Sequence, residues 1–179
     1  MRAIAEFAMR GRVYAIAISM VAAALPLLGW LSTVIVALVC LRSGIAAGSV
    51  IFLWTLLPLG VALYFVGDPS PMITLVGAFV MAMLLRQTLS WELVLIASVV
   101  LSAVGALIFE FSAAGILDRF VQFYIDYLEQ VDASVVIDPG QARKLLIGFF
   151  AVGQAFSMVV MLMIARWCQS ALYNLGGFR

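Results

Sequence analysis

Long stretches of this chain carry no charged side chain, and this pattern constrains the fold more than any other feature. The first stretch covers residues 13 to 41. As one straight helix it would be about 43 Å long, well beyond a bilayer hydrocarbon core of roughly 30 Å. Hydrophobic residues make up 66% of the chain and charged residues 11%, so a water-soluble fold would expose too much apolar surface. We therefore expect an all-α membrane protein whose main partner is the lipid bilayer.

Breaks between the apolar stretches predict a bundle of six transmembrane helices. In the first stretch Pro26 removes a backbone donor, Gly29 permits a turn and Trp30 suits an interface, which predicts two short helices. The fourth stretch, Met72 to Leu85, is short before Arg86, so it recruits its flanks, tilts little or is re-entrant. The expected spans form one domain, residues 1–179, and lie at about residues 11–26, 30–42, 45–66, 70–87, 92–111 and 142–166.

The charged residues orient this bundle. With a cytoplasmic N-terminus, six spans place most basic residues inside, as the positive-inside rule prefers: Arg2, Arg10, Arg12, Arg42, Arg86, Arg166 and Arg179. Most acidic residues then fall outside: Asp68, Glu110, Asp118, Asp126, Glu129, Asp132 and Asp138. Five spans would put Arg42 opposite Arg10 and Arg12. We expect a multi-pass protein of the bacterial inner membrane with both termini cytoplasmic, and no cleaved signal peptide, because cleavage near Ala22 to Ala24 would truncate a span.

An amphipathic helix is expected at about residues 115–132, between the fifth and sixth spans. Its apolar positions recur at helical spacing, and its acidic and amide residues fill the complementary arc. Lysine and arginine are scarce on its polar face, which argues against capture by anionic lipid. The helix is either an interfacial connector, a lid over the outer face or a surface for a partner.

Composition argues against several classes of function. Histidine is absent and Cys40 and Cys168 lie in or beside apolar stretches, so we expect no metal site and no cofactor. The net charge is +1 with no basic stripe, so nucleic acid is not an expected partner. No paired carboxylates, nucleophile elbow or phosphate loop suggests an enzyme.

Four residues are candidates for binding a small-molecule ligand. Trp30, Asp68 and Glu110 fall at the predicted outer ends of their helices, where a carboxylate either marks the water boundary or binds a cation or amine. Gln154 falls near the middle of the sixth span, where an amide needs a partner. It serves either as a link between helices or as a ligand contact.

Small residues at four-residue spacing mark helix faces that permit close approach. Ala15, Ser19 and Ala23 form the first such stripe, and these faces serve either internal packing or a membrane protein partner. The shorter pairs are Gly44 and Gly48, Ala78 and Ala82, and Ser102 and Ala106. The polar turn from Arg86 to Glu92 either anchors the ends of the two helices or contacts a cytoplasmic or membrane partner.

Both ends of the chain resemble one family. The segment Ala165 to Phe178, ARWCQSALYNLGGF, is similar to the ARWxQaxLYNPGGF stretch of the YybS-like predicted bacterial membrane proteins, with Leu175 in place of proline. The N-terminal pieces that also look similar are Met9 to Arg12, Leu25 to Leu28, Trp30 to Ser32, Leu38 to Val39 and Leu41 to Gly44. Because that family continues with further hydrophobic helices, the resemblance implies either a short member or a piece of a longer protein.

The resemblance implies an architecture similar to the S-components of energy-coupling-factor transporters, six-helix proteins that bind substrate near the outer face. In those proteins an AxxxA stripe on the first helix meets the coupling subunit, and Ala15, Ser19 and Ala23 are the corresponding candidates. A solute-binding transport subunit predicts an outer pocket lined by Trp30, Asp68 and Glu110 and closed by the amphipathic helix. The alternative, an accessory or assembly subunit, predicts an exposed face of small residues and no pocket.

Overall fold

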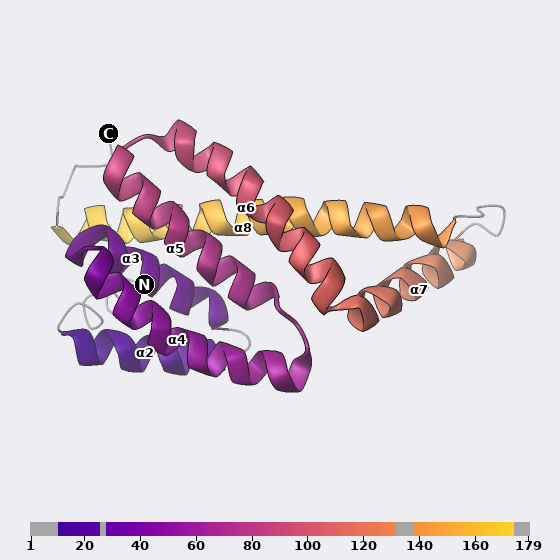
Figure 1. Ribbon diagram of the computed structural model, residues 1–179, viewed down its shortest axis with the longest axis horizontal. Coiled ribbons are helices and arrows are strands. Elements are labelled where there is room, and N and C mark those ends of the chain that lie inside the picture. Colours follow the sequence, from indigo (N-terminus) through magenta and orange to yellow (C-terminus); the bar gives the residue numbers. More distant parts are fainter. Residues whose placement is uncertain (1–10, 26–27, 132–137, 174–179) are drawn as a thin grey trace.

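The computed structural model describes residues 11–25, 28–131 and 138–173. Over these residues the chain forms seven helices and no strand, which confirms the all-helical prediction (Figure 1). Their bounds are α2 Arg12–Ala24, α3 Gly29–Ser43, α4 Ile45–Val66, α5 Ser70–Thr88, α6 Trp91–Ser112, α7 Ala114–Val131 and α8 Pro139–Tyr173. Parts of the sequence predictions lie outside the described residues: Arg2, Met9, Arg10, Pro26, Asp132, residues 174–178 of the C-terminal motif, and Arg179.

Four of these helices, α4, α5, α6 and α8, are long and apolar enough to cross a membrane. Helices α2 and α3 are apolar but have 13 and 15 residues, which at about 1.5 Å per residue is shorter than a hydrocarbon core of roughly 30 Å. The run from residue 13 to 41 does form two helices, as predicted. The short fourth apolar stretch extends into its flanks to give a continuous helix, α5.

Helix α8 is longer than the span expected for it. It begins at Pro139, where the Asp138 carboxylate accepts a hydrogen bond from Gln141 N at 3.2 Å, and it continues past Arg166 to Tyr173. The predicted span, about residues 142–166, began beside Arg143 and ended at Arg166. A charged residue marks the edge of an apolar segment, but it does not end a helix. At its first turn, proline is favoured because its missing N–H has no intrahelical partner.

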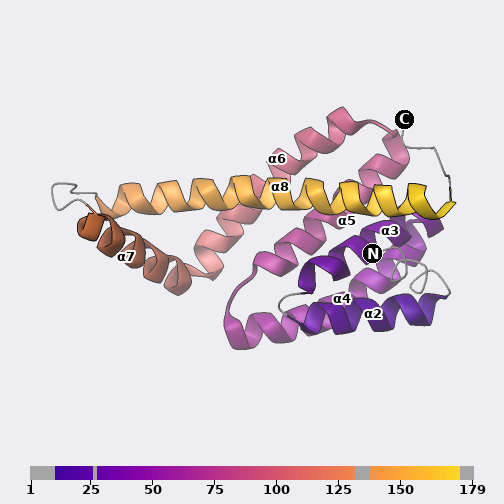
Figure 2. The same cartoon turned by 180° about the vertical axis from the view of Figure 1, so that it is seen from behind.

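Helix α3 lies at the centre of the bundle, in contact with α2, α4, α5 and α8 (Figures 1 and 2). Every residue from Leu31 to Leu41 is buried, so α3 has no lipid-facing side. A single residue, Gly44, joins α3 to α4 with φ of +104°, a conformation that favours glycine. The two helices then run so close that a Cβ added at Gly48 would lie 2.8 Å from the Cys40 Cα.

Helices α4, α6 and α8 have broad exposed apolar faces. On α6 the exposed residues include Ile96, Val99, Val100 and Leu107, and on α8 they include Phe149, Val152 and Phe156. Faces of this size are covered by lipid in a membrane protein. The four candidate spans and these exposed faces together define an integral membrane protein.

Helix α7 lies along the N-terminal part of α8, and the two extend beyond the rest of the bundle (Figures 1 and 2). Leu117 and Val121 are buried in a small cluster with Ala142. Phe120 and Tyr127, assigned to the same apolar arc in the sequence, are more than half exposed. The apolar face of α7 is wider than the surface of α8 that it contacts. Only the residues in the middle of that face are therefore buried.

Candidate functional site

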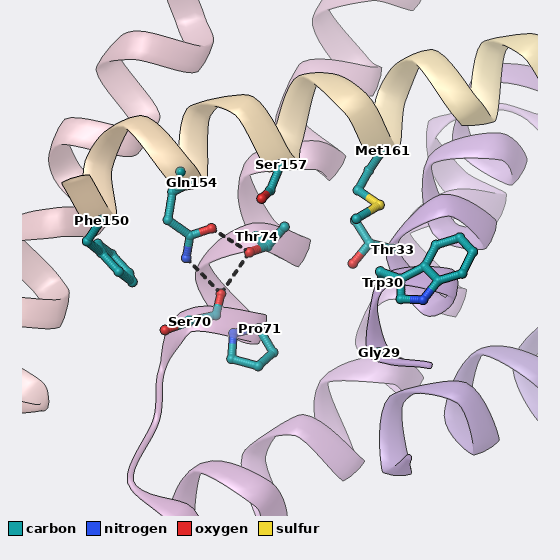
Figure 3. A pocket seen from close by; sticks show the side chains of 11 residues that line it. Gly29, Trp30, Thr33, Ser70, Pro71, Thr74, Phe150, Gln154, Ser157 and Met161 are labelled. Carbon is teal, nitrogen blue, oxygen red and sulfur yellow. Dashed lines mark hydrogen bonds between the residues drawn. The ribbon is translucent and has the colours of Figure 1, made fainter. Parts of the chain in front are cut away.

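A pocket of about 410 Å³ lies between the N-terminal ends of α3 and α5 and the middle of α8 (Figure 3). Its wall combines hydroxyl and amide groups with two rings. The lining residues are Gly29, Trp30 and Thr33 of α3, Ser70, Pro71 and Thr74 of α5, and Phe150, Gly153, Gln154, Ser157 and Met161 of α8. Helix α7 contributes none of them, since it packs on earlier turns of α8, so the structure does not support α7 as the lid of this pocket.

The Gln154 side chain is held in place by the first turn of α5. Its Nε2 donates to the Ser70 carbonyl oxygen at 3.1 Å, and its Oε1 accepts from the Thr74 hydroxyl at 2.6 Å (Figure 3). That hydroxyl also lies 2.8 Å from the Ser70 carbonyl oxygen and shares its proton between the two acceptors. Gln154 is only 6% exposed, and these bonds remove most of the cost of burying its amide.

Asp68, just before the start of α5, is joined to this hydrogen-bond network through Ser70. Its Oδ1 accepts hydrogen bonds from the backbone N–H of Ser70, at 2.9 Å, and from the Ser70 hydroxyl. A carboxylate at this position stabilises the helix N-terminus, because the free backbone N–H groups there carry partial positive charge. Asp68 therefore supports the wall of the pocket without lining it.

Two hydroxyl groups in the pocket wall have no partner among the described residues. The Thr33 and Ser157 hydroxyls both face the cavity (Figure 3). Thr33 is only 3% exposed, and its unpaired hydroxyl keeps part of that small exposure, since no fully buried side-chain oxygen among the described residues lacks a partner. Trp30 and Phe150 lie toward opposite ends of the pocket in this view and supply its aromatic surface.

The four predicted ligand residues are only partly brought together. Trp30 and Gln154 line the same pocket, and Asp68 is one hydrogen bond away from it. Glu110 does not reach the pocket: its Oε1 lies 3.6 Å from Arg143 Nε of α8. Arg143, a basic residue that six spans would place on the outer side, thus neutralises Glu110, because α6 and α8 pack side by side.

The hydroxyl residues of the pocket were not predicted from the sequence: Thr33, Ser70, Thr74 and Ser157. A signal for them was present, since Ser70 and Thr74 are four residues apart and Gln154 and Ser157 three apart, spacings that place each pair on one helix face. Serine and threonine are common in apolar helices, so the spacing alone did not distinguish these residues from those used for packing.

The small-residue stripe of α2 faces the interior of the chain. Ala15, Ser19 and Ala23 are all buried, and the Thr55 hydroxyl of α4 lies 3.0 Å from the Ser19 hydroxyl, sharing its proton between that oxygen and the Ile51 carbonyl oxygen. Of the other spaced residues, Gly44 is half-buried and the rest are buried: Gly48, Ala78, Ala82, Ser102 and Ala106. These surfaces serve internal packing in this structure and are not accessible to a partner.

Charges of opposite sign lie at the two ends of the bundle. Arg86 Nη1, near the end of α5, donates to the carbonyl oxygens of Cys40 and Leu41 at 3.1 and 2.5 Å, and so caps the C-terminus of α3. The start of α3 lines the pocket beside Ser70, the residue that Asp68 holds at the start of α5. The pocket therefore lies at the acidic end and Arg86 at the basic end.

The fold and the pocket define the class: an all-helical integral membrane protein with a cavity at one end of its bundle. Over the described residues no group of three or more histidine, cysteine, aspartate or glutamate side chains is placed to hold a metal ion. The chain matches no protein-family model, no curated protein and no solved structure.

Proposed function

We propose that this protein is a solute-binding subunit of a membrane transporter. The observation that carries the proposal is the pocket of about 410 Å³ that joins Trp30 to Gln154. Its volume falls within the roughly 300–1,000 Å³ of ligand sites, which combine apolar walls with a few oriented polar groups. Helix packing alone does not explain why Gln154 lies beside an open cavity.

The proposed topology has six spans, with α2 and α3 crossing as a short pair and α7 lying at the outer face. The positive-inside rule then puts the Arg86 end in the cytoplasm and the pocket outside. Both termini are cytoplasmic in the bacterial inner membrane. A pocket at the outer end suits a subunit that takes up solute from outside the cell.

Similarity to the YybS-like family and to transporter S-components is part of this proposal. The pocket near one end of the bundle is consistent with that architecture. Ala15, Ser19 and Ala23, the stripe aligned with the coupling motif, face α4 in this chain. Coupling through these residues would require α2 to move away from α4, so we place the coupling contact elsewhere on the lipid-facing surface.

Native mass spectrometry of the detergent-purified protein tests the proposal. We expect a retained small molecule in the wild type and its loss in Gly153→Trp, which fills the pocket. Gly148→Trp is the matched control, since Gly148 is also an exposed glycine of α8, lies outside the pocket lining, and a Cβ at either glycine meets nothing within 4 Å. Retention in both variants, or a co-purifying protein in place of any small molecule, contradicts the proposal and favours an accessory subunit.

Cysteine labelling tests the topology separately. Asp126→Cys on α7 and Gln87→Cys at the end of α5 are exposed positions, whereas the native Cys40 and Cys168 are buried. An impermeant thiol reagent added to intact cells is expected to label the α7 position only. Equal labelling of both positions from one side contradicts six spans.

A further inference from the structure

The proposed solute pocket has no charged side chain in its wall, although it lies at the acidic end of the bundle. All 11 lining residues are neutral. A cation would meet no carboxylate there, and an anion would meet no lysine or arginine. Burying a charge without a partner is far more costly than burying a neutral polar group.

Asp68 adds a further penalty for an anion. Its carboxylate lies within hydrogen-bond distance of Ser70, a lining residue, and it offsets the positive end of the α5 helix dipole. That carboxylate is directed at the backbone N–H and hydroxyl of Ser70. It repels negative charge in the pocket without offering a direct contact to a cation.

Thr33 is an exception among the four threonines of the chain. Thr55, Thr74 and Thr88 each donate to the carbonyl oxygen four residues earlier, at 2.7 to 2.8 Å. For Thr33 that carbonyl belongs to Gly29, and the Ser32 hydroxyl engages it at 2.6 Å. The Thr33 hydroxyl bonds to no described residue, and it belongs to a side chain that lines the pocket wall in a residue that is 3% exposed.

Other hydrogen-bond donors are also unused. Gln154 has two amide hydrogens, of which one is directed at the Ser70 carbonyl oxygen. The second hydrogen, the Ser157 hydroxyl and the Trp30 indole N–H have no partner among the described residues. A wall rich in free donors is complementary to a solute that carries acceptor oxygens.

We infer that the pocket binds an uncharged, ring-bearing solute with carbonyl or amide oxygens, which accept from Thr33, Gln154 and Ser157 while the ring lies on Trp30 or Phe150. This inference rests on the proposed function, because it names the class of solute for the same pocket. Aromatic contact supplies affinity, and the absence of charged groups supplies selectivity.

Three probes of nearly equal size test the class of solute: indole-3-acetamide is neutral, indole-3-acetate is an anion and tryptamine is a cation at pH 7. Equilibrium dialysis against the detergent-purified full chain measures each dissociation constant. We expect the amide to bind at least about tenfold more tightly than either charged probe, since an unpaired buried charge outweighs one neutral hydrogen bond.

Two variants locate the binding. Thr33→Val keeps the side-chain shape and removes the hydroxyl, and we expect it to weaken amide binding by about tenfold at most, as for one hydrogen bond. Ser157→Ala is a second test on a half-buried position, in case Thr33→Val fails to fold. Thr88→Val, at the opposite end of α5, is the control and is expected to leave binding unchanged.

Failure of this inference is distinguishable from failure of the proposed function. Equal or tighter binding of indole-3-acetate or tryptamine, or no binding of the amide, overturns the neutral class of solute. The proposed function is judged by the retained small molecule and its loss in Gly153→Trp but not Gly148→Trp. Amide binding that is insensitive to both Thr33→Val and Ser157→Ala also overturns the assignment.

Discussion

Helices α3 and α8 are both apolar, yet their surroundings are different. From Leu31 to Leu41 every residue of α3 contacts protein, whereas α8 exposes Phe149, Val152 and Phe156 to lipid. Hydrophobicity does not separate the two environments, because lipid is as apolar as a protein core. Helix contacts do: α3 packs against α2, α4, α5 and α8, whereas α8 leaves part of its surface without a neighbouring helix.

The largest effect is expected at the close approach between α3 and α4. Gly48→Leu would place a Cβ 2.8 Å from the Cys40 Cα, with three further carbons beyond it, and it should lower the free energy of unfolding by about 3 kcal/mol, the upper end of the usual cost of overpacking. Gly60→Leu is the control on the same helix, because a Cβ there meets nothing within 4 Å. Equilibrium unfolding by SDS in mixed micelles measures both. Similar stability of the two variants would show that α3 and α4 are not in close contact.

Truncating one side chain on each helix tests the contrast directly. Leu38→Ala removes a side chain that is 1% exposed, so we expect a loss of about 2–3 kcal/mol from the cavity left behind. Phe156→Ala removes one that is 70% exposed and should cost under about 0.5 kcal/mol. The same SDS titration measures both variants. A larger cost for Phe156 would mean that this face of α8 packs on protein.

Arg86 stabilises α3 from outside the core. Arg86→Met removes the donor to the Cys40 and Leu41 carbonyl oxygens, so we expect a loss of about 1–2 kcal/mol, typical of a charged hydrogen bond at a helix C-terminus. Thermal unfolding in detergent should show a lower midpoint for this variant. Gln87→Met, at the exposed neighbouring position, is expected to be neutral. Equal midpoints for the two variants argue against the cap.

The smallest effect is expected where α6, α7 and α8 meet. Arg143 contacts Glu110 at 3.6 Å and Asp118 at 2.8 Å, with side chains that are partly exposed. Arg143→Met should cost less than about 1 kcal/mol, because water and salt screen such pairs. The difference from wild type should shrink in high salt, as read by thermal unfolding. Lys144→Met serves as control, and a salt-independent difference would point to packing of the Arg143 stem instead.

Helix positions were largely predictable because their signals are local. Gly67, Asp68 and Pro69 separate α4 from α5, and the break before Trp30 separates α2 from α3. The bond between Asp68 and Ser70 is local too, with only Pro69 between the two residues along the chain. Such features follow from backbone chemistry and need no knowledge of neighbouring helices.

The candidate site was only partly predictable because its contacts join distant segments. Gln154 was expected to need a partner, but the partner, Thr74, lies 80 residues away in the chain. Glu110 was assigned to the same outer mouth on the basis of depth alone. Two residues at the same depth in the membrane can still point toward different sides of the bundle. The Glu110 carboxylate therefore lies against Arg143 and does not reach the pocket.

The sequence by itself determined that this chain is helical and belongs in a membrane. Apolar stretches of this length must satisfy their backbone groups internally, and within one segment only a helix does so. Tertiary structure alone decided which apolar faces meet lipid, which small residues pack inside, and which polar groups meet across a pocket. Those outcomes depend on how the helices rotate and cross, and hydropathy along the chain contains little information about either.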